Sequence, residues 1–175
     1  MQKGFSLVEL IVVLALTVVV LVVAYNIMES GQVTQRRIDE QIQAQMTARR
    51  NIAKITKYLR QCAEIKIAGG YQVEVFSDID DDGENETVRF YLSNENLYQT
   101  IDGGAPVKLG DFIRNNSKGE PVFTYIDLEH NALVGGSPLA ITHTRSIKIK
   151  LIIDVKEGSL PNAFNLETEI RLRNL

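Results

Sequence analysis

Acidic residues are concentrated in the stretch 78–86, which contains six of them. Asp78, Asp80 and Asp82 alternate and are followed directly by a glycine, as in the first half of a calcium-binding loop, where alternate carboxylates converge and glycine permits a sharp turn. The second half of that pattern is absent, because Arg89 occupies the position of the bidentate glutamate. Two interpretations remain open: a solvated hairpin turn, which the sequence favours, and a weak calcium site made of the three alternating aspartates.

Histidine and cysteine offer little further chemistry. The chain has 2 His and 1 Cys, and His130, His143 and Cys62 have no partner at ligand or catalytic spacing. A single cysteine excludes an internal disulfide and a multi-cysteine metal site. No recognisable nucleophile motif is present, so we predict that the protein is not an enzyme and has no cofactor other than the calcium considered above.

One carboxylate stands at the start of a long apolar run. Glu9 is followed by residues 10–28, nineteen consecutive residues without a charge. As a helix, this run would span roughly 28 Å, close to the hydrocarbon thickness of a bilayer. Because a carboxylate in that environment is costly without a partner, Glu9 requires a nearby positive group. A new amino terminus made by cleavage after Gly4 would supply it.

The residues around Glu9 resemble a known processing motif. Met-Gln-Lys-Gly followed by Phe-Ser-Leu-Val-Glu-Leu is similar to the leader and cleavage site of type IV prepilins and type II secretion pseudopilins. The resemblance implies cleavage between Gly4 and Phe5, N-methylation of Phe5, and pairing of Glu9 with the methylated terminus of a neighbouring subunit. It also implies four partners: a prepilin peptidase/methyltransferase, other pilin or pseudopilin subunits, an inner-membrane assembly platform and the lipid bilayer.

Two other interpretations of the N-terminus remain open, namely a secretory signal peptide cleaved after Val22-Val23-Ala24 and a plain single-pass anchor. A carboxylate inside the apolar run and helix-forming sequence beyond it both favour the prepilin interpretation. Since Lys3 and Arg36-Arg37 nearly balance across the run, the orientation is taken from the resemblance. It implies a cytoplasmic N-terminus, an extracytoplasmic head, and later a cell-surface or periplasmic filament.

A long helix is expected to carry these residues. Between Gly31 and Gly69 there is neither Pro nor Gly, and helix-forming residues dominate. We predict one continuous helix from Phe5 to about Cys62, and Gly69-Gly70 is expected to stop the helix from continuing further. Its second half presents a narrow apolar stripe expected to be buried: Ile38, Ile42, Met46, Ile52, Ile55 and Leu59.

The remainder of the chain has the pattern of short strands joined by tight turns, which indicates a mainly antiparallel sheet. The predicted strands are Tyr71–Ser77, Thr87–Leu92, Asn96–Ile101, Val107–Leu109, Val122–Ile126, Thr144–Val155 and Phe164–Leu172. The predicted fold class is therefore α+β, with the second half of the helix packed on the sheet. The predicted domains are a leader (1–4), a transmembrane half (5–28), an amphipathic half (29–62) and a β-rich head (63–175).

Charge is distributed unevenly along the chain, whose formal net charge is -3. Residues 32–62 carry seven Lys/Arg against two Asp/Glu, whereas residues 63–175 carry eleven against eighteen. The basic stretch could contact DNA or acidic lipids, but no aromatic residues interleave with its cations. Contact with acidic surfaces of adjacent subunits is the favoured interpretation, and binding of nucleic acid remains open but unsupported.

The head also carries features of one branch of the resembled family. The acidic turn followed by Val88-Arg89-Phe90-Tyr91-Leu92, and the terminal Arg171-Leu172-Arg173-Asn174, resemble W-type minor pilins and J-type minor pseudopilins. The proline frequent in the upper membrane helix and the paired cysteines of many major pilins are missing. The resemblance implies a minor subunit of a filament in a pilus, a type II secretion system or a DNA-uptake system. The alternative is a secreted or membrane-anchored binding module, such as a calcium-dependent adhesin.

Overall fold

The computed structural model describes residues 7–80, 82–155 and 163–172. The chain divides into two compact units, residues 1–39 and residues 40–175. We call the second unit the head; it comprises the β-rich head predicted at 63–175 together with residues 40–62. Gly4 and Phe5 of the predicted cleavage site, and Arg173 and Asn174 of the C-terminal pattern, lie outside the described residues. The boundaries predicted at residues 4, 28 and 62 stay predictions.

The first element is the helix α1, Leu7–Arg60, of 54 residues. Lys57 and Arg60 in its last turn complement the partial negative charge of the helix C-terminus. The helix ends within two residues of the predicted Cys62. The prediction that Gly69-Gly70 closes it is wrong, because strand β1, Cys62–Ala68, separates the helix from these glycines. Three side chains of this strand are buried, so packing and pairing outweigh its helix propensity.

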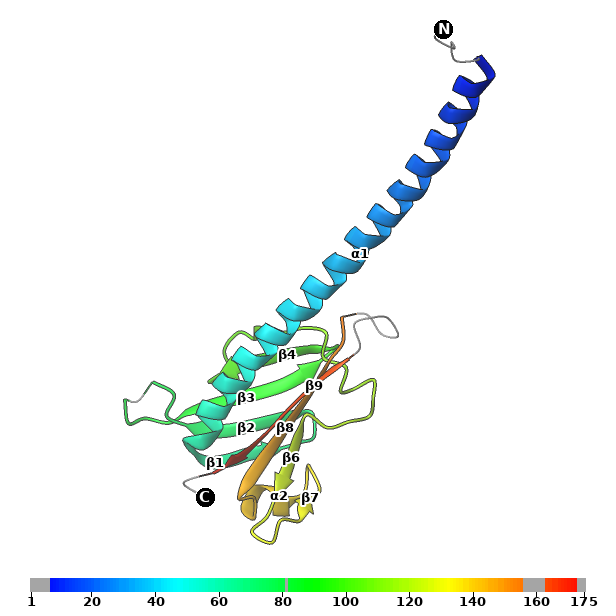
Figure 1. The fold of residues 1–175 in the computed structure, drawn as a ribbon. Helices are drawn as coiled ribbons and strands as arrows, with labels where there is room; N and C mark the ends of the chain where they lie inside the picture. Colours follow the sequence, from blue (N-terminus) through cyan, green and yellow to red (C-terminus); the bar gives the residue numbers. More distant parts are fainter. Residues whose placement is uncertain (1–6, 81, 156–162, 173–175) are drawn as a thin grey trace. The chain divides into compact units, whose positions relative to one another are not determined.

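Five antiparallel strands form a first sheet in the order β1-β2-β3-β4-β5. The strands after β1 are β2 Gln72–Ser77, β3 Glu86–Ser93, β4 Asn96–Ile101 and β5 Val107–Gly110. Each strand pairs with the next in the chain, as expected where tight turns separate short alternating runs. In Figure 1 the last turns of α1, drawn in cyan, lie across this sheet.

Four strands form a second antiparallel sheet, in the order β7-β6-β8-β9. They are β6 Phe123–Ile126, β7 Ala132–Leu133, β8 Ser146–Ile153 and β9 Phe164–Arg171, and a short helix α2, Pro138–Thr142, precedes β8. The sequence predicted neither β7 nor α2. Ser137 caps α2 by accepting a hydrogen bond from the amide of Ala140. The predicted α+β fold class, a long N-terminal helix on antiparallel sheets, is confirmed.

The buried face of α1 differs from the predicted stripe in its first half. The buried positions are Gln41, Ala44, Ala48, Ile52, Ile55 and Leu59. Ile38, Ile42 and Met46 are instead exposed, at 42%, 47% and 53%. Small alanine side chains at 44 and 48 therefore belong to the buried face, whereas the larger apolar side chains lie on a neighbouring face. The prediction was right for Ile52, Ile55 and Leu59 only.

Side chains of α1 also make polar and aromatic contacts with successive strands of the first sheet. The Lys54 ammonium donates to Oε1 of Gln99 in β4 at 2.7 Å. The backbone carbonyl of Tyr58 accepts a hydrogen bond from the Ser77 hydroxyl of β2 at 3.0 Å, and its ring stacks on Phe90 of β3 at 6.2 Å. These contacts fix the register of the helix on the sheet.

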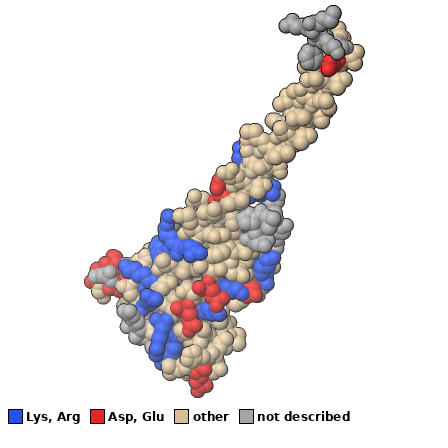
Figure 2. All heavy atoms as spheres, in the orientation of Figure 1, with Lys and Arg blue, Asp and Glu red and all other residues tan. Residues whose placement is uncertain are grey.

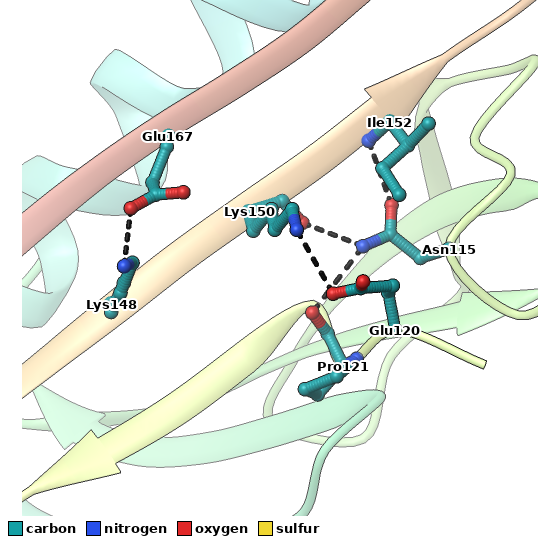
Figure 3. A network of polar contacts seen from close by, with 7 residues as sticks. All are labelled: Asn115, Glu120, Pro121, Lys148, Lys150, Ile152 and Glu167. Carbon is teal, nitrogen blue, oxygen red and sulfur yellow. Dashed lines mark hydrogen bonds and ion pairs between the residues drawn. The ribbon is translucent and has the colours of Figure 1, made fainter. Parts of the chain in front are cut away.

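Two buried amide side chains hold the second sheet by pairing with backbone groups. Asn115 is fully buried, and its Oδ1 accepts from the amide of Ile152 at 2.9 Å while its Nδ2 donates to the carbonyls of Lys150 and Pro121 at 2.8 and 3.3 Å. Figure 3 shows this network beside the ion pair between Lys150 and Glu120. Gln41 of α1 acts in the same way at the end of β8, with Nε2 on the Ile153 carbonyl and Oε1 on the Val155 amide, both at 3.1 Å.

Candidate functional site

Glu9 is an exposed carboxylate at the beginning of the described part of α1. The large apolar side chains that follow it, from Leu10 to Met28, are all more than half exposed. An 18-residue window of this helix has a mean hydropathy of 3.1, none of it is buried within the chain, and it is long and apolar enough to cross a membrane. The next cation along the helix, Arg36, lies 27 residues further, about 40 Å away. A cation for Glu9 must therefore come from outside the described helix.

The acidic stretch is the loop of the β2–β3 hairpin. The two strands pair in register from Gln72↔Tyr91 to Ser77↔Glu86, so the predicted hairpin is confirmed. The loop is organised by its own side chains, because Asp78 accepts from the amide of Gly83 at 3.0 Å and Asp82 accepts from the amide of Glu84 at 2.8 Å. Gly83 has a φ of +92°, which favours glycine at this turn.

Three carboxylates of the hairpin lie close together, but they are not the three that the sequence singled out. One oxygen each from Asp78, Asp80 and Glu86 lie within 4.8 Å of one another. Glu86 also accepts from the amide of Ile79 at 3.0 Å. The Asp82 carboxylate lies outside this group. Calcium binding at this hairpin stays a prediction. The carboxylates that the structure brings together at a candidate calcium site are those of Asp78, Asp80 and Glu86.

The sequence did not single out Glu86 as a calcium ligand, because Glu86 does not stand at a ligand position of the calcium-loop pattern. It is the first residue of β3, and pairing with Ser77 returns its side chain to the mouth of the hairpin. Arg89, which breaks the calcium-loop pattern, lies further along β3. Its guanidinium binds the Gln72 side chain and lies 5.3 Å from the centre of the Tyr91 ring. Arg89 therefore contributes to the sheet surface.

A cleft of about 1030 Å³ opens in the head beside this hairpin, and we call it the α1–β9 cleft. Its lining includes three cations of α1, one residue of each of two edge strands, and one carboxylate of the hairpin loop: Arg49, Lys57, Arg60, Ala63, Thr168 and Asp78. In Figure 2 the red side chains of the hairpin loop lie beside blue side chains on the same face of the head. No sequence pattern predicted this cleft, because its walls come from segments far apart in the chain.

The basic residues of α1 are partly engaged within the head. Arg49 lies over the ring of Phe164 in β9, 5.3 Å from its centre, and Lys54 binds Gln99 as described above. Arg50 and Arg60 are exposed. The basic stretch predicted from the sequence is thus not one continuous free surface, since some of its cations hold the helix on the sheets.

The cysteine is buried in the core, and the two histidines lie at a helix end and in a turn. Burial raises the pKa of Cys62 to about 12, and its thiol donates to the carbonyl of Glu64 at 3.2 Å. His143 caps α2 and contacts the Thr142 hydroxyl, whereas His130 lies in a turn with a φ of +64°. Within residues 7–80, 82–155 and 163–172, neither histidine is hydrogen-bonded to the Cys62 thiol, so no histidine is placed to activate it as a nucleophile.

The family described as the prokaryotic N-terminal methylation motif matches residues 1–25. The chain carries a type IV prepilin-like N-terminus. This motif implies processing by a prepilin peptidase, and together with the apolar helix it indicates a membrane-anchored, pilin-like protein. Neither this motif nor the α+β fold of the chain shows which subtype of pilin-like subunit the protein is. A search of curated proteins finds no match to this chain.

Proposed function

We propose that this protein is a minor pilin or pseudopilin, a structural subunit that is processed by prepilin peptidase and assembled into, or at the tip of, a type IV pilus-like filament. The observation that carries the proposal is the methylation motif at residues 1–25 on a helix whose apolar part is unburied within its own chain. Such a surface requires lipid before assembly and other apolar helices after it.

In this proposal Gly4 and Phe5 form the cleavage site, and Phe5 becomes the methylated N-terminus. A secondary amine at that terminus is a cation within reach of a neighbouring subunit's Glu9. The pair would remove the cost of an isolated carboxylate in an apolar surrounding, because opposite charges attract strongly where water is excluded. Each incoming subunit would thereby be drawn into register with the one before it.

The head supports a minor rather than a major subunit through the resemblance of its β3 sequence to W-type and J-type subunits. Filament systems for adhesion, secretion and DNA uptake all fit this proposal. Its partners are the peptidase/methyltransferase, other subunits of the same class and an inner-membrane assembly platform. Direct binding of nucleic acid is not part of the proposal.

Intact-mass analysis of the membrane-extracted protein tests the processing step. We expect a chain that lacks Met-Gln-Lys-Gly and begins at Phe5 with one added methyl group. Gly4→Glu is expected to retain the leader, because the bulky charged side chain replaces the small residue before the cleaved bond. A mature terminus at Tyr25 would instead identify a secretory signal peptide and refute the proposal.

Substitution of Glu9 tests the assembly step separately. Glu9→Val is expected to preserve membrane insertion, since it removes a charge from an apolar helix, and to abolish co-purification with partner subunits. Glu29→Val is the matched control, because Glu29 is an exposed glutamate further along the same helix. Normal co-purification of the Glu9 variant would contradict the role given to Glu9.

A second candidate function is a calcium-dependent binding module on a membrane anchor. The observation in its favour is the close group formed by Asp78, Asp80 and Glu86. Repulsion among these carboxylates would be relieved by a divalent cation. A calcium-dependent surface and a filament subunit are compatible, and intact-mass analysis separates a processed subunit from an unprocessed anchored module.

A further inference from the structure

We propose that the α1–β9 cleft is a docking site for an extended, acidic peptide segment of a partner protein, which adds as a strand to the free edge of β9. The cleft lies wholly within residues 40–175, so this inference goes beyond incorporation of the chain into a filament. It also stands independently of N-terminal processing.

Two edge strands border the cleft. β9 is the last strand of the second sheet and β1 is the first strand of the first sheet, and within the described parts of the chain each pairs with a strand on one side only. Ala63 of β1 and Thr168 of β9 both line the cleft. An edge strand presents unpaired backbone donors and acceptors, which are a template for an added strand.

The core-facing row of β9 is incompletely covered. Its neighbour β8 contributes Ile147, Ile149, Leu151 and Ile153 to the core, all with 0% exposure. The residues of β9 that pair with these four are Ile170, Thr168, Leu166 and Phe164. Ile170 is buried, whereas Thr168, Leu166 and Phe164 are only half-buried. An added strand would cover these side chains, since its own alternate residues would face the same side.

The charge of the cleft selects an acidic occupant. Arg49 and Arg60 in its lining are exposed cations, and among the described residues that line the cleft Asp78 is the one carboxylate. Arg49 and Arg60 are eleven residues apart, about 16 Å along the helix, which corresponds to about five residues of an extended chain. A strand with carboxylates at alternate positions therefore meets cations along its length.

A peptide fits these features better than a nucleic acid does. Phosphates would also be attracted to the cations, but single-stranded nucleic acids gain much of their affinity by stacking bases on aromatic rings. Among the described residues, none of those lining the cleft is aromatic. The backbone groups of the edge strands, in contrast, are suited to pairing with another peptide backbone.

Peptide binding to the full chain in nonionic detergent micelles tests the proposal. The probe is a fluorescein-labelled peptide of four Glu-Val repeats, followed by fluorescence anisotropy at low salt. Two control peptides have Lys in place of Glu, or N-methyl groups on alternate residues that block strand pairing. We expect the acidic peptide to bind at least tenfold more tightly than either control, and to slow hydrogen exchange in residues 164–171.

Charge variants locate the binding site. Arg60→Glu is expected to weaken binding of the acidic peptide about tenfold, and Arg60→Gln to weaken it less. Arg50→Glu is the matched control, because Arg50 is exposed on the same helix but is not among the residues lining the cleft. The near-ultraviolet circular dichroism of the tyrosines verifies that each variant retains the folded head.

Several results would overturn the inference. Equal affinity for the acidic and N-methylated peptides would exclude strand addition, and equal effects of the Arg50 and Arg60 charge reversals would exclude the cleft. Absence of binding at millimolar peptide, or displacement by oligothymidine at equal concentration, would exclude an acidic peptide as the occupant. A natural chain that intact-mass analysis finds with its leader attached would contradict the processed-subunit proposal, whereas the present inference depends only on peptide binding by the head.

Discussion

Replacement of Gln41 by Met tests whether one buried amide holds the helix on the second sheet. Gln41 is 2% exposed, and its side chain satisfies the carbonyl of Ile153 and the amide of Val155. Methionine has a similar length and retains the packing but offers neither hydrogen bond. The substitution therefore removes the side-chain hydrogen-bond partner of the Ile153 carbonyl and of the Val155 amide.

The expected cost follows from those two groups. A buried donor or acceptor left without a partner costs about 1–3 kcal/mol, and the apolar methionine recovers a part of this by burial. We expect a net loss of about 2–4 kcal/mol in the free energy of unfolding of the head. For a domain of this size, the corresponding decrease in melting temperature is roughly 4–16 °C.

The melt is followed by near-ultraviolet circular dichroism of the full chain in detergent micelles. This signal reports the packing of the tyrosines of the head, such as Tyr58 and Tyr125, and the apolar helix adds only the contribution of Tyr25, which is 68% exposed within the chain. Gln43→Met is the matched control, since Gln43 lies exposed on the same helix. If the two variants melt at the same temperature, the reasoning about Gln41 is refuted.

Three further predictions concern the hairpin, the helix and the cysteine. If the hairpin binds calcium with a dissociation constant of about 10⁻⁴–10⁻³ M, a tenfold excess over that constant should stabilise the head by about 1.4 kcal/mol, and Asp80→Asn should abolish the effect; an equal shift with sodium chloride of the same ionic strength would favour the solvated turn. A fragment of residues 29–175 should be soluble and folded, whereas 63–175 should not, because it lacks Ile52, Ile55 and Leu59 of the core; a cooperative melt of the shorter fragment would contradict this. Because burial raises the pKa of Cys62 from its ordinary value of 9.0 to about 12, its stabilising contribution is present below about pH 9 and is lost as pH rises from 9 to 12. The difference in stability between the natural chain and Cys62→Ala should shrink over that range, and a pH-independent difference would refute it.

The sequence alone was informative wherever the decisive interactions are local. The apolar run after Glu9 and the motif around Gly4 and Phe5 are contiguous, so their meaning does not depend on folding. The hairpins from β2 to β5 were predicted within one or two residues, because alternating side chains and turn residues lie next to each other in the chain. The long helix was predicted for the same reason, since propensity and the absence of Pro are local properties.

Contacts between distant segments determined the rest. Residues 62–68 became a strand because burial of Cys62, Ile65 and Ala68 and pairing with β2 outweighed a helix-like composition. The first half of the buried stripe was predicted on the wrong face, because the prediction followed the larger apolar side chains. The folded chain instead buries Ala44, Ala48 and the amide of Gln41, which pairs with backbone groups at the end of β8.

The candidate sites divide in the same way. Glu9 was found from the sequence, because a carboxylate in an apolar run is unusual wherever the chain folds. Glu86 joined Asp78 and Asp80 only when the hairpin closed, because strand register decides which side chains meet across a turn. The α1–β9 cleft exists only in the folded head, since its cations come from a helix, its edges from two different sheets, and its carboxylate from a loop between them.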